Sequence, residues 1–407
     1  MHRTISRRDF FRDAAVFSVL GGLAPQFLTR TAEGAAAISG FKDDRVLVVL
    51  QLGGGNDGLN TLVPCGDDAY YNARPVLGLR GNGLVKITDG VAFNAGMTAF
   101  MRMYDDGKLA IVQGVGYPNP DRSHFRSMEI WHTASDADQY ESSGWIGRYF
   151  DHECSGSARP HVGVALGKDR PQAFDGRSGL GVSFEDPRRF GWQPGEGADS
   201  EENFARLNAP QGKGDSTIDF LRHVTSNAIM SSHEVREAAD RAGATFEAKQ
   251  PLARSLETVA DLIRGGLQTR IYYVSLSGFD THANQLRQHN NLLAEVGESL
   301  RAFQQRLAND GASGRVLTMV FSEFGRRVHE NRSGGTDHGT AAPMFLLGDH
   351  VKPGLFGEYP SLTNLDDGDL IHTVDFRSVY SSVLQDWFGI NPKGVLRGTF
   401  EPTPIIA

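Results

Sequence analysis

This chain contains six short apolar runs, with amphipathic segments between several of them. The runs cover residues 46–52, 109–112, 162–166, 271–276, 316–321 and 344–347. Helical patterns occur at 125–134, 145–152, 218–242, 253–265, 286–307 and 376–388. Continuous apolar strands that alternate with such helices are typical of a mostly parallel sheet covered by helices on both faces. The sequence therefore predicts an α/β fold.

One segment departs from this pattern. Residues from 167 to about 215 are rich in Gly, Pro and charged residues and have no clear period. Long irregular segments in a compact domain usually act as lids or insertions. We therefore expect an inserted cap over the sheet at about 167–250, and the 407 residues are enough for one large core with such an insertion or for two domains.

Metal-binding residue types follow or precede four of the apolar runs. The candidate ligands are Asp57, Asp280, His282, Glu323, Asp337 and His338. In a parallel sheet, the residues just past the carboxyl ends of the strands face a common crevice, so we expect these side chains to meet there. Carboxylates and imidazoles bind zinc or manganese and leave a position open for a reactant. The pattern predicts a hydrolytic centre with a divalent metal.

Some of these residues also have a purely structural interpretation. Asp280 can cap its turn, and Asp337 can hold the imidazole of His338 instead of binding a metal directly. A carboxylate at Glu323 follows a buried strand and can be paired with Arg326 or Arg327. The glycine loop before Asp57 lacks the spacing and the lysine of phosphate-binding loops, so a dinucleotide or nucleotide site is not indicated.

A candidate nucleophile lies in the segment PNPDRSHFR. Pro118 and Pro120 prevent a helix before residue 121, so Ser123 falls near a helix start, where free amides and the dipole favour an anion. Arg122 and Arg126 are four residues apart and can reach the same face. Ser123 is therefore either the nucleophile that attacks an ester, with the arginines on its oxyanion, or only the N-cap of the helix.

The amino terminus has the features of an export signal. Residues 1–37 contain SRRDFF, with Arg7 and Arg8, then an apolar stretch too short for a membrane span, and a small-residue cleavage region. This order predicts a twin-arginine signal peptide, export by the twin-arginine translocase, and a periplasmic or extracellular location. The net charge of −8 and the lack of a basic block indicate no nucleic-acid partner. Cys65 and Cys154 are compatible with one disulfide or with two free thiols.

Several longer motifs carry a family resemblance. They are GGGNDGLNTLVP, RSHF, GFDTHANQ, FSEFGRR, GTDHGTAAPMFLLG and VDFRSVY. With them the chain resembles a family of exported, twin-arginine proteins of unknown function (domain of unknown function 1501) in the alkaline phosphatase and sulfatase superfamily. The resemblance implies an alkaline-phosphatase-like three-layer sandwich that spans residues 38–407.

The resemblance also implies roles for individual residues. In that superfamily two metal sites surround a nucleophile, so Asp280, His282 and His338 would form the first site, and Asp57 and Glu323 would belong to the second. Phe324 stands where the superfamily often has a further ligand, so one zinc or manganese ion is expected rather than two. Neither cysteine lies in the CxPSR motif of formylglycine sulfatases, which that chemistry requires.

These features together predict an exported metallohydrolase of a phosphate or related ester, with a small-molecule or polymer substrate. Arg326, with Arg122 or Arg126, would hold the substrate anion over Ser123. Two alternatives remain open at this stage. One is a protein of the same fold that has lost catalysis and binds a ligand, glycan or protein at the cell surface, and the other is a metal-binding protein without a substrate.

Overall fold

The computed structural model describes residues 43–153, 160–191, 201–209, 217–243 and 248–407. Within these residues a nine-stranded sheet has the spatial order β11-β5-β10-β9-β1-β8-β6-β7, and β14 pairs with β5. The strands are β1 (Val46–Gly53), β5 (Leu109–Gly116), β6 (Gly163–Leu166), β7 (Val182–Phe184), β8 (Ile271–Ser277), β9 (Val316–Phe321), β10 (Ala342–Leu347), β11 (Gly354–Phe356) and β14 (Val374–Asp375). Only β10 runs antiparallel to its neighbours, β5 and β9.

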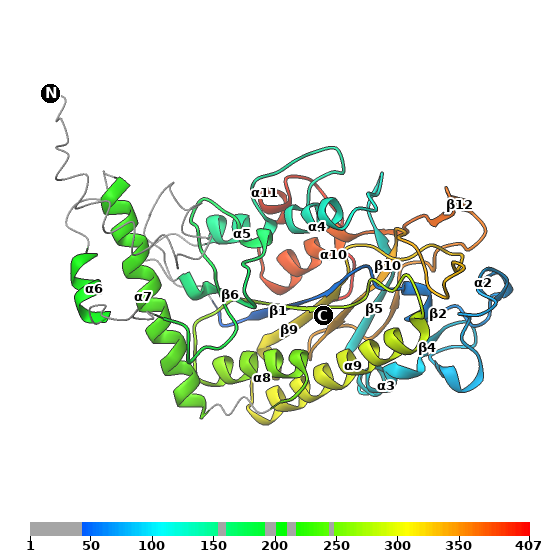
Figure 1. Ribbon diagram of the computed structural model, residues 1–407, viewed down its shortest axis with the longest axis horizontal. Coiled ribbons are helices and arrows are strands. Elements are labelled where there is room, and N and C mark those ends of the chain that lie inside the picture. The colour runs from blue at the N-terminus through cyan, green and yellow to red at the C-terminus, as the bar shows by residue number, and fades with distance from the viewer. Residues whose placement is uncertain (1–42, 154–159, 192–200, 210–216, 244–247) are drawn as a thin grey trace.

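Helices cover both faces of this sheet (Figure 1). Along β1, Val46, Val48 and Leu50 enter one hydrophobic core, whereas Leu47 and Val49 enter the other, as the two-residue period of a strand requires. The first core is closed by α3 (Thr98–Asp105), α8 (Pro251–Arg264) and α9 (Gln285–Asn309). The second is closed by α4 (His124–Thr133), α5 (Trp145–Glu153), α10 (Phe376–Ser382) and α11 (Pro392–Leu396). The fold is a three-layer sandwich.

The predicted fold class is confirmed. Each of the six apolar runs forms a strand of the central sheet, and the predicted helices correspond to α4, α5, α7 (Thr217–Ala242), α8, α9 and α10, which continues into a π-helical turn (Val383–Trp387). The apolar pattern did not indicate the direction of β10. Because β10 is antiparallel, its amino end lies at the same edge of the sheet as the carboxyl ends of its neighbours.

The described part of the segment predicted as a cap contributes one strand to the central sheet. Its β7 extends the central sheet beside β6, and α6 (Glu201–Leu207) and α7 lie at one end of the molecule in Figure 1. The apolar residues Val235, Ala238 and Ala239 of α7 are buried in the first core, near α8 and the 3₁₀ turn Pro160–Val162 that precedes β6. Helix α7 therefore lies toward the amino ends of the strands, whereas the residues that directly follow β6 and β7 start at the carboxyl ends of these strands.

Smaller elements surround the carboxyl ends of the strands. A three-stranded sheet consists of β2 (Leu62–Val63), β4 (Ala92–Asn94) and β3 (Leu84–Lys86), and α2 (Asp68–Ala73) lies beside it. A short hairpin joins β12 (Leu365–Asp366) to β13 (Asp369–Leu370). Its two turn residues, Asp367 and Gly368, have φ values of 49° and 83°, which is the geometry of an Asp-Gly hairpin turn.

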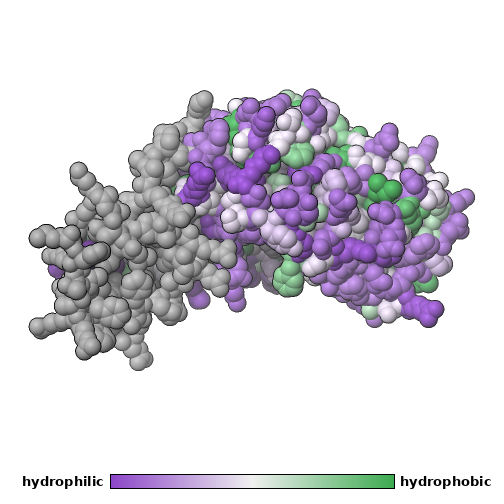
Figure 2. Space-filling model, turned by 90° about the horizontal axis from the view of Figure 1, so that it is seen from above, coloured by the Kyte–Doolittle hydropathy of each residue, from purple (hydrophilic) through white to green (hydrophobic). Residues whose placement is uncertain are grey.

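The surface and the amino terminus bear on the predicted location. The face seen in Figure 2 is largely hydrophilic, and its apolar residues form small patches. In the part of the chain that the structure describes, no helix is both long and apolar enough to span a bilayer. The predicted signal peptide at 1–37 lies outside the described residues, as does Cys154, whereas Cys65 is a free thiol near the carbonyl of Asp89.

Candidate metal centre

Five loops meet at the carboxyl edge of the central sheet. Four of them follow β1, β5, β8 and β9, and the fifth leads into β10, whose amino end lies at this edge. These five strands are neighbours in the sheet, in the order β5-β10-β9-β1-β8. Side chains from distant parts of the sequence therefore come together here, as expected for an α/β sheet.

A carboxylate lies at the centre of the convergence. Asp280 Oδ1 is 2.9 Å from His282 Nε2 and 3.1 Å from His338 Nε2, and its Oδ2 is 3.6 Å from His124 Nε2. One ligand atom from each of His124, Asp280 and His338 lies within 4.8 Å of the others, which is a spacing compatible with a single metal ion. The four side chains are partly exposed, so a reactant can approach them from solvent.

Hydrogen bonds fix the orientation of two of the imidazoles. His338 Nδ1 is 2.9 Å from the carbonyl of Arg122, and His124 Nδ1 is 2.8 Å from Glu323 Oε1. A carbonyl or a carboxylate can only accept, so Nδ1 donates in each ring, and in the neutral form of the ring Nε2 keeps a free lone pair. Metal-binding histidines in proteins are held in the same way, through the nitrogen that does not touch the metal.

The third imidazole shows the same arrangement. His282 Nδ1 is 3.4 Å from Asp337 Oδ1, and its Nε2 is 3.0 Å from Nε2 of His338. With Nδ1 protonated in both rings, neither Nε2 atom has a proton to donate to the other. Two lone pairs and a carboxylate thus point at one another, which is unfavourable unless a cation lies between them or one ring takes up a second proton.

The electrostatics of the cluster favour an ionised carboxylate. Burial opposes the charge on Asp280, but the hydrogen bond from Arg326, the neighbouring imidazole of His338 and the positive charge of Arg326 outweigh it and lower the pKa of Asp280 to about 2. Asp337 keeps a lowered pKa because Asn331 and His282 both donate to it. The cluster therefore combines ionised carboxylates with imidazole nitrogens, which is the donor set that zinc and manganese bind.

Arg326 holds three of the converging loops together. Its Nε donates to the carbonyl of Gly55 at 2.6 Å, Nη1 to Thr336 at 2.9 Å, and Nη2 to Phe279 at 3.0 Å. Nη2 also donates to Asp280 Oδ1 at 2.7 Å and to the carbonyl of Gly54.

This environment corrects the hypothesis that Arg326 holds a substrate anion. The Arg326 side chain has 0 % exposure and its donors already have acceptors in the chain, so it supports the loops and is not accessible to an anion.

The family follows from the sequence over most of this architecture. Residues 44–385 match the model of the family described as "Protein of unknown function (DUF1501)". The chain belongs to this family. The predicted family is thus confirmed, and twin-arginine export remains a prediction for the DUF1501 chain. No curated protein sequence is detectably similar to it.

Solved structures with a similar outline come from bacteria. The lipoteichoic acid synthase LtaP from Listeria monocytogenes has 9 % identity and a TM-score of 0.42, covering 93 % of this chain and 78 % of its own. A protein in the alkaline phosphatase superfamily from Vibrio parahaemolyticus has 9 % identity and a TM-score of 0.38, and the match covers 95 % of this chain and 77 % of that one. The C-terminal periplasmic domain of EcEptC from Escherichia coli, in complex with zinc, has 9 % identity and a TM-score of 0.39. The match covers 87 % of this chain and 85 % of that one.

The two carboxylates predicted for a second metal have other partners in this DUF1501 protein. Asp57 is fully buried, and Arg74 Nη1 donates to it at 2.7 Å while Gln285 and the backbone of Asn60 donate to the remaining positions. Burial raises the pKa of Asp57, but Arg74 more than reverses this effect and the pKa is lowered. The assignment of Asp57 as a metal ligand is corrected, because a carboxylate saturated by a buried ion pair has no free lone pair to offer.

Glu323 supports the first cluster instead of forming a second one. Its Oε1 accepts from His124 Nδ1 and from the backbone N–H of Gly54 at 2.8 Å, and Ser322 Oγ lies 3.2 Å from Oε2. Phe324 packs against the rings of both His124 and His338, at centroid distances of 4.9 and 4.8 Å. Among the described residues, one group of metal-type ligands lies close enough together to hold an ion, and the number of bound ions stays a prediction.

The predicted nucleophile lies beside the cluster. Ser123 is exposed at the N-cap of α4, and its side chain makes no capping hydrogen bond to the helix. The next residue is His124, which enters the cluster. The alternative role of Ser123 as a side-chain N-cap is therefore not realised in the structure, and its nucleophilic role stays a prediction.

The two arginines near Ser123 do not point at the cluster. Arg126 is buried, with Nη1 2.7 Å from Glu129 and Nη2 donating to backbone carbonyls of the loop that follows α4. Arg122 Nη1 donates to Asp369 at 3.1 Å. The role of Arg126 on an oxyanion is corrected, because its charge is used to hold this loop and to stack on Tyr140.

His124 is the residue that the sequence analysis missed. Adjacent side chains usually point away from each other, so a Ser123–His124 dyad is not predicted from the sequence. In the structure α4 starts at His124, and this first-turn side chain reaches Glu323 and Asp280 across the ends of β9 and β8. The only signal in the sequence was the histidine itself in the motif RSHF.

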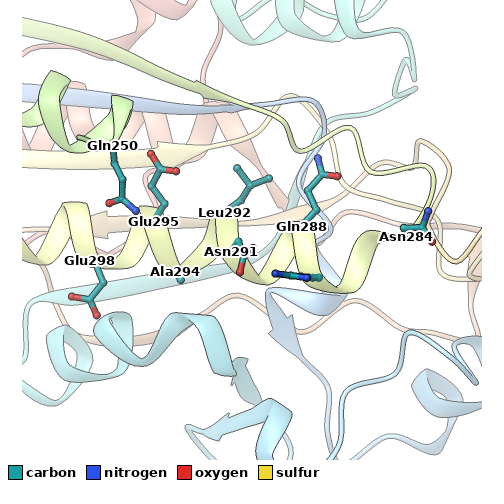
Figure 3. A pocket seen from close by; sticks show the side chains of 9 residues that line it. Gln250, Asn284, Gln288, Asn291, Leu292, Ala294, Glu295 and Glu298 are labelled. Carbon is teal, nitrogen blue, oxygen red and sulfur yellow. The ribbon is translucent and has the colours of Figure 1, made fainter. Parts of the chain in front are cut away.

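A groove with a volume of about 840 Å³ lies along α9 (Figure 3). Its lining is mostly amide and charged side chains, namely Gln250, Asn284, Arg287, Gln288, Asn291, Leu292, Ala294, Glu295 and Glu298. The groove starts at Asn284, two residues after His282, and follows the helix away from it. None of the cluster residues lines it, so it is distinct from the candidate metal centre.

Proposed function

We propose that this protein is a metal-dependent hydrolase that acts on a phosphate or related ester. The observation that carries the proposal is the convergence of three imidazole Nε2 atoms on one ionised carboxylate, with Nδ1 of every ring held by an acceptor. The acceptors are Glu323, Asp337 and the carbonyl of Arg122. Such a constellation serves no evident packing purpose at a partly exposed edge, and its donors match those of catalytic zinc and manganese sites.

Each residue has a defined task in this proposal. His124, Asp280 and His338 would hold the divalent ion, with His282 at its side, and the ion would polarise the ester and lower the pKa of an attacking hydroxyl or water. Glu323 keeps the Nδ1 proton of His124 in place and so directs Nε2 to the ion. Arg326 fixes Asp280 and the loops around it, so that the ligands are arranged before the ion arrives.

Ser123 would supply the nucleophilic hydroxyl. It is exposed, it immediately precedes a ligand, and it lies at the amino end of α4, where backbone N–H groups and the helix dipole stabilise negative charge. A water molecule is the alternative nucleophile at the same centre. The two differ in whether a covalent phosphoryl-serine forms, which mass spectrometry can detect.

A binding protein without catalysis is the second candidate. It is favoured by the pairing of Arg122 and the burial of Arg126, because these are the cations that the sequence placed on the developing charge. In this case the metal would hold a ligand at the cell surface and no ester would be turned over. Export to the periplasm or the exterior, by the twin-arginine translocase, belongs to both candidates.

Metal content and ester turnover of the purified mature chain test the proposal together. We expect about one divalent ion per chain in the parent and in His152→Ala, a histidine variant on α5 outside the cluster, and a loss of metal in His338→Ala. Ser123→Ala should retain metal and lose most turnover of the responsive ester in a panel of phosphate mono- and diesters. Equal metal in the parent and His338→Ala would contradict the site, and metal without turnover of any ester would favour the binding protein.

A further inference from the structure

Two arginines beside the metal centre share one exposed carboxylate. Arg122 Nη2 donates to Asp367 Oδ2 at 3.4 Å, and Arg327 Nη2 donates to the same oxygen at 3.3 Å. Arg327 Nη1 also donates to the backbone carbonyl of Asp367 at 2.9 Å. A single oxygen between two guanidinium groups is the arrangement of a bound anion.

The carboxylate belongs to the turn of the β12–β13 hairpin. Asp367 is one of its two turn residues, and its side chain is 77 % exposed. The neighbouring Asp369 is only 5 % exposed, and its Oδ2 accepts from Arg122 Nη1 at 3.1 Å. The hairpin therefore contributes one buried carboxylate that aligns Arg122 and one exposed carboxylate that lies between the two arginines.

Both arginines start from backbone that contacts the cluster. The carbonyl of Arg122 accepts from His338 Nδ1, and the backbone N–H of Arg327 donates to the carbonyl of Asp337 at 3.0 Å. Arg122 also directly precedes Ser123. The two arginines that face Asp367 are thus attached to the same backbone segments that hold the candidate ligands.

The contact to Asp367 is of a kind that a stronger anion can replace. The Arg122 and Arg327 side chains are 40 % and 32 % exposed, and ion pairs with this exposure are weak and are screened by salt. A hairpin with two residue pairs contributes little stability of its own. A phosphate or sulfate group offers three oxygens to the two forks and forms stronger, bidentate hydrogen bonds.

We propose that Arg122 and Arg327 form a binding site for a phosphate or sulfate group, and that Asp367 occupies this site when no ligand is bound. The site would take a second anionic group of the substrate, next to the ester that is cleaved. This assignment to a substrate rests on the proposed hydrolase function, whereas binding of a free oxyanion does not. The expected substrate is then an ester that carries a further phosphate or sulfate group.

Titration of the full mature chain with inorganic sulfate, followed by calorimetry at low ionic strength, tests the site. Asp367→Asn removes the competing carboxylate and should bind sulfate about fivefold more tightly than the parent, on the scale of one exposed ion pair. Asp366→Asn is the matched control, since it removes the same charge from the same hairpin and no hydrogen bond or ion pair to either arginine is described for Asp366. Arg327→Gln should lose the binding, and the combined Arg327→Gln, Asp367→Asn variant should not regain it.

The outcomes separate this site from the metal centre. His282→Ala should impair the metal site yet keep the sulfate affinity of the parent, because His282 does not contact Arg122 or Arg327 in the structure. Loss of sulfate binding in His282→Ala alone would mean that the anion binds at the metal and would overturn the proposal. Equal affinities in Asp367→Asn and Asp366→Asn would overturn it as well, since the effect would then come from net charge. If sulfate binds as expected and an ester with a second anionic group is not preferred, the site stands and its assignment to a substrate is refuted.

Discussion

Removal of the carboxylate at Glu323 gives the sharpest test of the metal centre. Glu323 does not face the ion in our proposal, and it acts through His124. Its Oε1 accepts both the His124 Nδ1 proton and the Gly54 N–H, each at 2.8 Å. The two substitutions Glu323→Gln and Glu323→Ala therefore separate the charge of this group from its hydrogen bonds.

The magnitudes follow from which atoms each variant keeps. The amide oxygen of Gln can accept both protons in place of Oε1, and its NH₂ group would face Ser322 Oγ, which can accept. Only the negative charge behind the imidazole is lost, so we expect about tenfold weaker metal binding. Ala leaves both donors without a partner, and we expect about a hundredfold weaker binding together with a loss of about 1–3 kcal/mol in the free energy of unfolding.

Competition with a chromophoric chelator measures the affinity, and urea denaturation of metal-free protein measures the stability. Glu330→Gln is the matched control, because Glu330 accepts backbone N–H groups of Val76 and Leu77 outside the cluster. It should leave metal affinity at the parent value. Parent-like metal affinity in Glu323→Ala would refute the argument, since His124 would then bind no metal or would not need an orienting partner.

Three further predictions concern stability. The pKa of Asp57 in the folded protein lies below 3.8, its value in an unfolded chain, so the ionised carboxylate stabilises the fold fully above that pH and this stabilisation is lost as the pH falls. The metal-free Asp57→Asn variant has no such group. In urea titrations its free energy of unfolding should therefore decrease less than that of the parent between about pH 5 and 3. In Arg326→Lys, the ammonium group offers three donors to the five oxygen atoms that accept from Arg326. Urea denaturation should show that the free energy of unfolding falls by about 1–3 kcal/mol for each buried carbonyl left unpaired. Unchanged stability would contradict the structural role of Arg326. Chelation of the metal should lower the melting temperature of the parent. If free metal was present at a hundred times its dissociation constant, the loss in the free energy of unfolding is about 2.7 kcal/mol. The His338→Ala variant should show no such shift.

The fold could be predicted largely from the sequence because its strands are buried on both faces. A run such as 316–321 is apolar except for Thr318, and this pattern can be recognised without knowledge of which strands lie beside it. The direction of β10 and the place of β7 could not be predicted, since both depend on which strand each one pairs with. The cap over the sheet is predicted from composition, and composition does not indicate which end of the sheet a segment covers.

The site could be predicted in part for a related reason. Asp280 and His282 follow a parallel strand, so their place at the carboxyl edge of the sheet followed from topology. His338 precedes β10 and reaches the same edge only because β10 is antiparallel, which the apolar pattern does not indicate. His124 comes from the first turn of a helix, and its direction depends on how α4 is placed over the sheet. Asp57 and Arg326 were assigned by residue type, whereas their roles are decided by partners such as Arg74 and the loop carbonyls, which lie far away in the sequence.

The antiparallel β10 has a consequence for when the metal centre can form. His338 enters the cluster only because the chain turns back to start β10 at the site edge, and it comes from the last fifth of the sequence, while His124 comes from the first third. Contacts of such long sequence separation form slowly and after most of the chain is available. Metal capture is therefore expected as a late step that reports on completed folding. If the chain is exported already folded, the identity of the bound ion is determined by the metals available on the inner side of the membrane.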